Sequence, residues 1–222
     1  MITMTIIACI LMYIQAKKLV TREIKEDLGA KIILHSDLHL DTVLVNHDKI
    51  LNEVNKAKPE IIVITGDLCS NMKYFYRVET FIKKLSLNNK CPILVTLGNH
   101  DNKIFTKTGY KKQDYIAKIE KSGSNVHVLE NESFVYKGVQ FGGLADLRTN
   151  TADCNELTRK WREKATEKGY KFVLLTHNPD IVLTIDEINS PDIILAGHTH
   201  GGQMKMPFNI EFKIIKKDIL PK

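Results

Sequence analysis

Five short hydrophobic runs divide this chain of 222 residues, and each run is followed at once by a polar cluster that contains Asp, Asn or His. The runs are almost continuously hydrophobic, as strands are when both faces of their sheet are buried. They cover residues 31–35, 60–65, 92–97, 172–176 and 192–196. Between them, apolar residues recur at helical spacing over 50–57, 75–85 and 157–165. This alternation predicts an α/β sheet covered by helices.

The middle of the chain follows a different pattern. Hydrophobic runs at 126–129, 133–136 and 139–144 stand close together, with glycines at the turns and no helical stretch between them. Such spacing predicts a hairpin or a meander. Together with the βα units it predicts an α/β (α+β) fold, a two-sheet β-sandwich flanked by helices. The length and the 43% hydrophobic content suit one domain, which we place at 31–222.

The polar clusters contain residue types that bind metal ions. In chain order they supply Asp37, His39, Asp67, Asn99, His100, Asp101, His177, His198 and His200. Parallel strands end at the same edge of a sheet, which is where α/β proteins bind ligands, so we expect these side chains to lie together. Each cluster alone is a weak signal, because Asp, Asn and His also cap turns and helices. The full set in one order is a strong one.

Carboxylate and imidazole ligands together favour first-row divalent ions such as Mn, Fe, Zn or Ni over Mg or Ca. The candidates are too many for one ion and suit two. Two ions roughly 3.5–4 Å apart can clamp the attacking and leaving oxygens of an in-line phosphoryl displacement. The spacing alone does not tell whether His100 is a ligand.

The blocks SDLHL, GDL, GNHD, THNPD and AGHTHGGQ, in this order, resemble the five signature blocks of the calcineurin-like metallophosphoesterases. The resemblance covers about residues 31–206. The GHTHGGQ block and the hydrophobic N-terminus are most similar to a bacterial membrane-associated branch, which is related to enzymes that hydrolyse UDP-2,3-diacylglucosamine. The combined motifs are specific for the superfamily and say little about the substrate.

This resemblance implies a role for each candidate. One ion would be held by Asp37, His39, Asp67 and His200, and the other by Asp67, Asn99, His177 and His198. Asp67 would bridge the two ions, which are most readily Mn in vitro. His100 would steady or protonate the leaving oxygen, with Asp101 orienting its ring.

The activity that the resemblance implies is hydrolysis of a phosphate diester or monoester by a metal-bound hydroxide. A lipid-linked or nucleotide-sugar substrate is one candidate. The alternatives are a metal-poor scaffold that retains the fold and a truncated, weakly active fragment. Intact ligands favour the enzyme, because function lies in the site rather than in the fold.

The remaining histidines, His35, His47 and His127, are interpreted as structural, and Cys69 as a packing residue. Loops at 69–76 and 102–112 are the candidates for a specificity pocket. Within the first loop, Tyr74 to Tyr76 are equally suited to contact an acyl chain or base and to pack in a helix core. The net charge of +6 is spread along the chain, so it indicates no specific nucleic-acid or protein partner.

The N-terminus is a separate hydrophobic segment, placed at 1–18. Its first 16 residues carry no charged side chain and Lys17 and Lys18 follow. We expect a membrane anchor through 1–16 with the main domain in the cytoplasm, by the positive-inside rule. The alternative is a helix that lies on the domain.

The C-terminal end carries one further strand pattern. Apolar residues alternate with polar ones over about 208–215, and the chain stops at Lys222. We therefore expect a domain that is C-terminally short, with its last strands missing.

Overall fold

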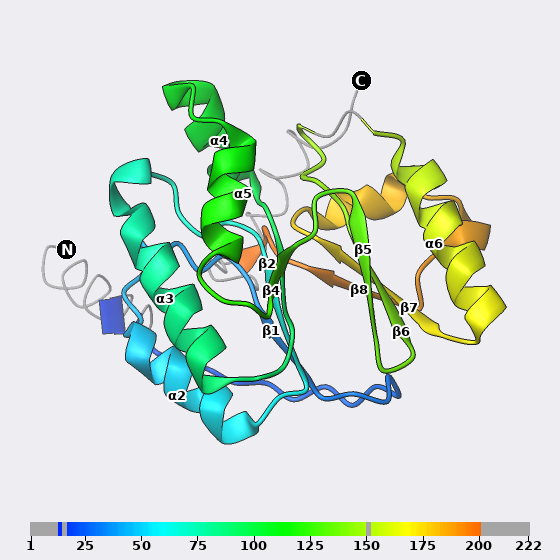
Figure 1. Ribbon diagram of the computed structural model, residues 1–222, viewed down its shortest axis with the longest axis horizontal. Helices are drawn as coiled ribbons and strands as arrows, with labels where there is room; N and C mark the ends of the chain where they lie inside the picture. Colours follow the sequence, from blue (N-terminus) through cyan, green and yellow to red (C-terminus); the bar gives the residue numbers. More distant parts are fainter. Residues whose placement is uncertain (1–12, 15–16, 150–151, 201–222) are drawn as a thin grey trace, which may run out of the picture.

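The computed structural model describes residues 13–14, 17–149 and 152–200, and within them two four-stranded sheets face each other (Figure 1). The strands of the first sheet are all parallel and lie in chain order. They are β1 (Ile32–His35), β2 (Ile61–Thr65), β3 (Ile93–Thr96) and β4 (Val126–Val128). Because the strands are parallel, their carboxyl ends lie at one edge of the sheet, as expected.

The second sheet is mixed. Its strands are β5 (Glu132–Tyr136), β6 (Val139–Gly143), β7 (Lys171–Thr176) and β8 (Ile193–Ala196). The expected hairpin is formed by β5 and β6, which are antiparallel and joined by Lys137 and Gly138, both at positive φ. The strands β6, β7 and β8 are parallel to one another.

The first of the three middle runs, residues 126–129, does not pair with this hairpin. The alternative prediction, a meander formed by all three runs, is therefore wrong. Strand β4 pairs in parallel with β3 and belongs to the first sheet. Val126 and Val128 are buried against the helices that cover that sheet. The chain then crosses to the second sheet through Asn131, whose φ of 63° marks a sharp turn. The hydrophobic pattern could not show which sheet the run would join.

Helices cover the outer faces of both sheets (Figure 1). On the first sheet these are α2 (His47–Ala57), α3 (Phe75–Asn88), α4 (Asn99–Thr108) and α5 (Lys112–Glu120). Helix α6 (Cys154–Lys168) covers the second sheet, and three short 3₁₀ turns complete the described elements. They are η1 (Met72–Tyr74), η2 (Pro179–Thr184) and η3 (Glu187–Asn189).

The prediction of a loop at 102–112 is wrong, because most of it lies in α4 and at the start of α5. The start of α4 is fixed by Asp101, whose Oδ2 accepts a hydrogen bond from Gly98 N at 2.9 Å. Gly109 ends the helix at a φ of 69°. The few apolar residues of this helix hid its periodicity.

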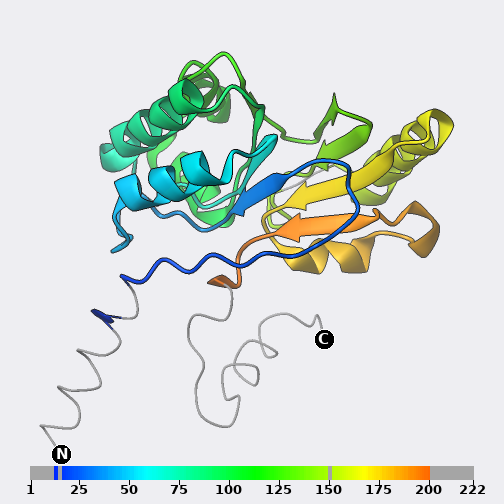
Figure 2. The same ribbon diagram turned by 90° about the horizontal axis from the view of Figure 1, so that it is seen from below.

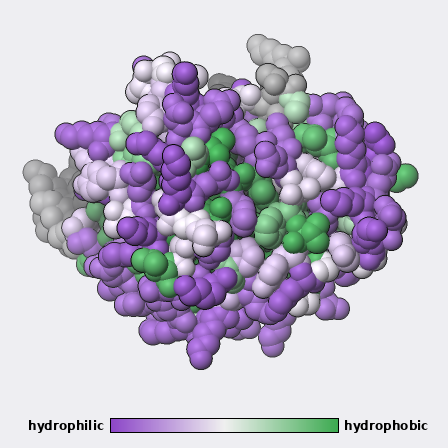
Figure 3. Space-filling view, viewed as in Figure 1, coloured by the Kyte–Doolittle hydropathy of each residue, from purple (hydrophilic) through white to green (hydrophobic). Residues whose placement is uncertain are grey.

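Strand β2 shows why the runs are continuously hydrophobic. Ile61 and Val63 face the second sheet and pack with Phe141 and Val173. Ile62 and Ile64 face the opposite way, into the core beneath α2 and α3. All five residues of β2 are buried, so the first sheet has an apolar core on each face. The face of the molecule shown in Figure 3 is mainly hydrophilic.

The segment before β1 is extended. Figure 2 shows it passing β8 and turning back before it enters β1. Leu28 and Ala30 pack against the core between the sheets. The expected anchor and the strand at 208–215 lie outside the described residues, apart from a few residues near the end of the anchor. Among the described residues, no helix has the length and apolar character needed to span a bilayer.

The second sheet and α6 meet at a glycine. A Cβ built on Gly142 would lie 2.2 Å from Cε3 of Trp161, which is closer than atoms can approach. We predict that Gly142→Ala lowers the free energy of unfolding in urea by about 1–3 kcal/mol, the usual effect of overpacking. The loss should shrink in a Trp161→Leu background, where the ring is absent. An equal loss in both backgrounds would contradict the contact.

Candidate metal centre

The predicted ligands all follow the carboxyl ends of strands, and they come from both sheets. Asp37 and His39 follow β1, Asp67 follows β2, and Asn99 follows β3. From the second sheet, His177 follows β7, and His198 and His200 follow β8. The two sheets bring these ends together at one edge of the sandwich.

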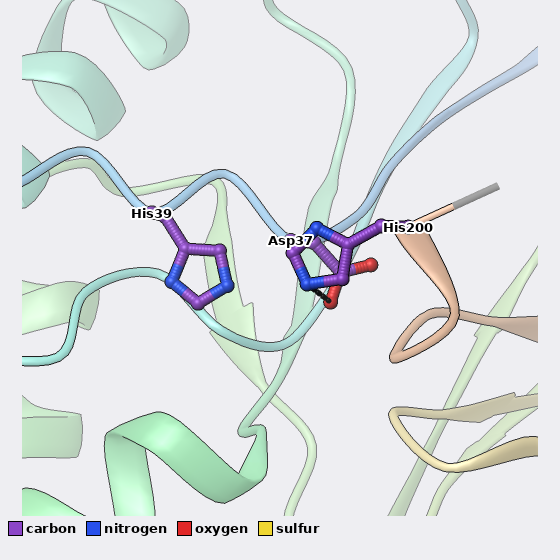
Figure 4. Close-up of side chains that lie close together, drawn as sticks. All are labelled: Asp37, His39 and His200. Carbon is purple, nitrogen blue, oxygen red and sulfur yellow. Dashed lines mark ion pairs between the residues drawn. The ribbon is translucent and has the colours of Figure 1, made fainter. Parts of the chain in front are cut away.

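One group of side chains consists of Asp37, His39 and His200 (Figure 4), whose ligand atoms lie within 4.8 Å of one another. His200 Nε2 is 3.7 Å from Asp37 Oδ1. The rings of His39 and His200 are stacked, with centroids 5.2 Å apart. Ser36 Oγ donates to the other oxygen of Asp37, Oδ2. This group has the carboxylate and imidazole donors of a transition-metal site.

A second group surrounds Asn99. The ligand atoms of Asp37, Asp67 and His177 lie within 4.8 Å of one another. Asn99 Oδ1 is 3.0 Å from His177 Nε2 and 3.0 Å from His198 Nδ1. The two histidine nitrogens are 3.2 Å apart.

The donor set of the second group fits a cation. The carbonyl oxygen of Thr65 is 3.0 Å from His177 Nδ1 and can only accept, so Nδ1 carries the proton. A neutral His177 therefore presents the lone pair of Nε2 to Asn99 Oδ1, which is also an acceptor. Two acceptors at this distance repel, and a cation between them turns the repulsion into binding. The same hydrogen bond fixes the ring, as in many metal sites.

Asp67 belongs to the second group and also approaches a histidine of the first. Its Oδ2 is 3.5 Å from His39 Nε2 and 3.5 Å from His177 Nε2, while Oδ1 accepts from His100 N at 2.8 Å. Burial, opposed by this hydrogen bond and reinforced by the charge of Asp37, raises the pKa of Asp67 to about 7. Burial also lowers the pKa of His39 and His198. A bound cation favours the charged carboxylate and the neutral imidazole, so it suits these residues.

The backbone of the candidate ligands is unusual, and no sequence pattern indicates this. Five of them have φ in the left-handed region, which disfavours residues with a Cβ. They are Asp37 (52°), His39 (37°), Asp67 (55°), His198 (70°) and His200 (50°). Such conformations cluster at functional sites, where the surrounding structure imposes them.

Glycines let the ligand loops approach one another. A Cβ on Gly98 would lie 2.2 Å from Asp67 Oδ1, and a Cβ on Gly197 would lie 2.0 Å from Ser36 Oγ. Gly98, which precedes Asn99, and Gly197, which precedes His198, therefore allow the loops to approach closely because they have no Cβ.

His100 is half-buried, and its ring contacts Ser70. Ser70 Oγ is 2.8 Å from His100 Nδ1, and Ser70 N donates to Asp41 Oδ2 at 3.0 Å. Burial, helped by the positive charge of Lys103, lowers the pKa of His100 to about 4. Ser70 was not singled out in the sequence, because a serine two residues past a GDL block has no distinctive pattern.

The prediction that Asp101 orients the His100 ring is wrong. The Asp101 carboxylate is fully buried and turns away to accept hydrogen bonds from its own surroundings. Its donors are Leu68 N at 3.1 Å, Cys69 N at 3.3 Å, Gly98 N at 2.9 Å and Tyr115 Oη at 2.8 Å. Asp101 thus ties the loop after β2 to the loop after β3, and it supports the backbone that carries Asp67 and Asn99.

Two of the three histidines interpreted as structural pack against aromatic rings. The rings of His47 and Phe81 meet edge to face, with centroids 6.1 Å apart, and the His127 ring lies 4.6 Å from that of Phe134. Cys69 is fully buried near Tyr115, and burial raises the pKa of its thiol to about 12. It is a packing residue, as expected.

The sequence model of the calcineurin-like phosphoesterase family matches residues 30–202. Because this match covers most of the chain, the chain belongs to that family. The expected superfamily and the α/β two-sheet fold are thereby confirmed.

Several curated relatives are bacterial. An uncharacterized metallophosphoesterase of Campylobacter jejuni is 30% identical over 86% of this chain and 48% of its own length. Phosphodiesterase YaeI of Escherichia coli is 28% identical over 80% of this chain and 63% of its own. UDP-2,3-diacylglucosamine pyrophosphatase LpxG of Chlamydia trachomatis is 22% identical over 81% of this chain and 66% of its own length. The expected relation to that branch is supported.

The solved structure of TT1561 from Thermus thermophilus shares the fold. It is 13% identical, with a TM-score of 0.53, over 75% of this chain and 80% of its own. This chain spans from about half to under two thirds of the length of the first curated relatives it matches.

The role of Asp101 can be tested through its charge. An Asn at this position would direct N–H groups at backbone donors, so we predict that Asp101→Asn lowers the free energy of unfolding at pH 8 by at least about 2 kcal/mol. Tyr115→Phe removes one donor only and should lower it by about 1 kcal/mol. Urea denaturation of both variants measures the difference. Wild-type stability in Asp101→Asn would show that the carboxylate does not hold the two loops.

Proposed function

We propose that this chain hydrolyses phosphate esters with two divalent cations at the candidate metal centre. The observation that carries the proposal is the pair of ligand groups joined by Asp67, whose Oδ2 is 3.5 Å from a histidine of each group. One cation would be held by Asp37, His39, Asp67 and His200. The other would be held by Asp67, Asn99, His177 and His198. Two such cations activate a water and neutralise the charge of a phosphoryl group in displacement.

His100 is the chain's own candidate for a catalytic residue. With its low pKa it is neutral at pH 7, and one of its nitrogens carries a proton. If Ser70 Oγ donates to Nδ1, that proton lies on Nε2, where it can form a hydrogen bond with a phosphoryl or leaving oxygen. His100 is next to His39, with ring centroids 4.9 Å apart, so it is within reach of a substrate bound there.

The substrate is proposed to be a phosphate diester or monoester, with a lipid-linked or nucleotide-sugar diester as the leading class. The name of the Escherichia coli relative supports a diester, and that of the Chlamydia trachomatis relative supports a lipid-linked nucleotide sugar. Phe75 packs in the core, whereas Tyr76 is exposed and the Arg77 guanidinium lies over the rings of Tyr74 and Tyr76. These two tyrosines therefore remain candidates to contact a base or an acyl chain.

The proposal is tested by metal analysis of the purified chain and by activity with added Mn²⁺. Bis-p-nitrophenyl phosphate and p-nitrophenyl phosphate separate diester from monoester hydrolysis. A chain that retains no metal and cleaves neither compound would support the scaffold alternative. Membrane association through 1–16 and a cytoplasmic main domain stay predictions, tested by fractionation of cells with and without detergent.

The bridging role of Asp67 predicts a specific metal content. Asp67→Ala should lose both ions, because the Asp67 carboxylate is a proposed ligand of each. Without it, each ion has one ligand fewer and lacks the negative charge of the bridging carboxylate. Asp48→Ala is the matched control, since Asp48 is an exposed carboxylate paired with Lys84 on the helical side of the first sheet. Metal is counted after gel filtration. One ion per chain in the wild type would contradict the bridge.

The role of His100 predicts loss of activity without loss of metal. His100→Ala should keep both ions and lower kcat by roughly 10²–10⁴-fold, the range for a general acid or base. The loss should be smaller for a p-nitrophenyl ester than for an alkyl ester, because the nitrophenolate leaves without a proton. Ser70→Ala should show a milder loss of the same kind. A metal-free His100→Ala protein would mean that His100 is a ligand.

A further inference from the structure

The hydroxyl of Ser70 lies between two histidine rings of the candidate metal centre. Its Oγ is 2.8 Å from His100 Nδ1 and 3.5 Å from His39 Nδ1. The two rings are nearly perpendicular, with centroids 4.9 Å apart. Among the described residues, Ser70 Oγ is the only hydrogen-bond partner of either nitrogen. One hydroxyl therefore joins a candidate ligand of the first group, His39, to the candidate catalytic residue, His100.

The backbone around Ser70 is fixed by two carboxylates from outside its own loop. Ser70 N donates to Asp41 Oδ2 at 3.0 Å, and Asp41 lies in the segment after β1. Cys69 N donates to Asp101 Oδ1 at 3.3 Å, and Asp101 lies in α4. The loop cannot carry the hydroxyl away from the two rings without breaking these hydrogen bonds. The contact of one hydroxyl with two rings is therefore imposed by the fold.

The number of protons available decides how these three groups can be bonded. A hydroxyl has one proton to donate and lone pairs with which it accepts, and a neutral histidine carries a proton on only one ring nitrogen. Histidine is neutral at pH 8, and burial lowers the pKa of both His39 and His100. Ser70 can therefore donate to one ring only, and it accepts from the other. The direction of the bond at one ring sets the direction at the other.

The ring of His39 decides which direction holds. Its Nε2 is 3.5 Å from Asp67 Oδ2, so Nε2 is the nitrogen that faces the proposed cation. When Nε2 gives its lone pair to a cation, Nδ1 carries the proton and donates to Ser70 Oγ. Ser70 then donates to His100 Nδ1, and the proton of His100 lies on Nε2.

Without a cation the same contacts favour the opposite direction. The Asp67 carboxylate is then the acceptor next to His39 Nε2, so Nε2 carries the proton. Nδ1 of His39 becomes an acceptor and takes the proton of the Ser70 hydroxyl. The lone pair of Ser70 Oγ accepts from His100 Nδ1–H, which leaves Nε2 of His100 without a proton. All three groups stay uncharged in either direction, and only the positions of their protons differ.

We propose that Ser70 is a positioning residue that couples cation binding at His39 to the tautomer of His100. With the cation bound, the hydroxyl fixes the proton of His100 on Nε2, where it is available to a leaving oxygen. Without the cation, that proton is held on Nδ1. The inference rests on the proposed function, because it assumes that His39 holds a cation, and it adds the reason why His100 presents Nε2–H when the site is loaded.

The spectroscopic test is nitrogen NMR of the histidine rings in the full chain at pH 8, stripped of metal and then saturated with Zn²⁺. Zn²⁺ is used because it is diamagnetic, unlike Mn²⁺. In the wild type, Zn²⁺ should move the proton of His100 from Nδ1 to Nε2. In Ser70→Ala, Zn²⁺ should still change the spectrum of His39 and leave the tautomer of His100 unchanged. Ser70→Thr keeps a hydroxyl and should restore the response.

Activity at saturating Mn²⁺ is the second readout, and saturation is needed because Ser70→Ala also removes a partner of His39. Ser70→Ala should lower kcat by roughly 10–100-fold, the usual effect of losing such a hydrogen bond, and Ser70→Thr should recover most of it. In a His100→Ala background, Ser70→Ala should cause no further loss. Ser86→Ala is the matched control, because the Ser86 hydroxyl donates to Asn125 at the amino end of the first sheet. It should change neither readout.

The outcomes separate this inference from the proposed function. If calorimetry shows that the wild type binds Zn²⁺ but the His100 tautomer does not respond, the coupling is wrong and the proposed function stands. An equal response in Ser70→Ala, or a further loss of kcat without His100, also overturns the role of Ser70. A wild-type chain that binds no divalent cation would instead overturn the proposed function, and this inference with it.

Discussion

The arrangement of the candidate metal centre depends on holding atoms together that repel one another. The carboxylates of Asp37 and Asp67, the amide oxygen of Asn99 and the lone pair of His177 Nε2 all face a small volume. The left-handed backbone at five candidate ligands adds strain at the same place. Neither feature is favourable alone, so the rest of the fold must impose both. Bound cations would remove the repulsion between the ligand atoms, whereas the backbone strain would remain.

Around Asp67 and Asn99, the burial of β2 and β3 on both faces imposes this arrangement. Strand β2 is packed against helices on one side and the second sheet on the other, so its end, and with it Asp67, has little freedom. The Asp101 carboxylate then fixes the loops after β2 and β3 to each other through four donors. Because this hydrogen-bonded carboxylate is buried in an apolar core, it holds the loops that carry Asp67 and Asn99 more rigidly than surface loops would be held.

The sequence predicted the parts of the fold and the site that depend on local pattern. Buried strands, the three amphipathic helices and the order of ligands could be read because each leaves a periodic or compositional trace. The sheet that β4 joins could not, since Val126 and Val128 suit either sheet. Helix α4 was missed because its start depends on Asp101 and Gly98 rather than on an apolar stripe. Ser70 was missed because the meaning of a lone polar residue depends on what lies across from it in space.

The candidate ligands are divided between the two sheets. Asp37, His39, Asp67 and Asn99 follow strands of the first sheet, whereas His177, His198 and His200 follow strands of the second. Ions bound there would fasten one sheet to the other at the open edge of the sandwich. During synthesis the first sheet is complete once β4 has emerged, yet no full ligand group exists until β8 has docked. Metal loading would then come late in biogenesis, and an occupied centre would mark a chain whose two halves have already joined.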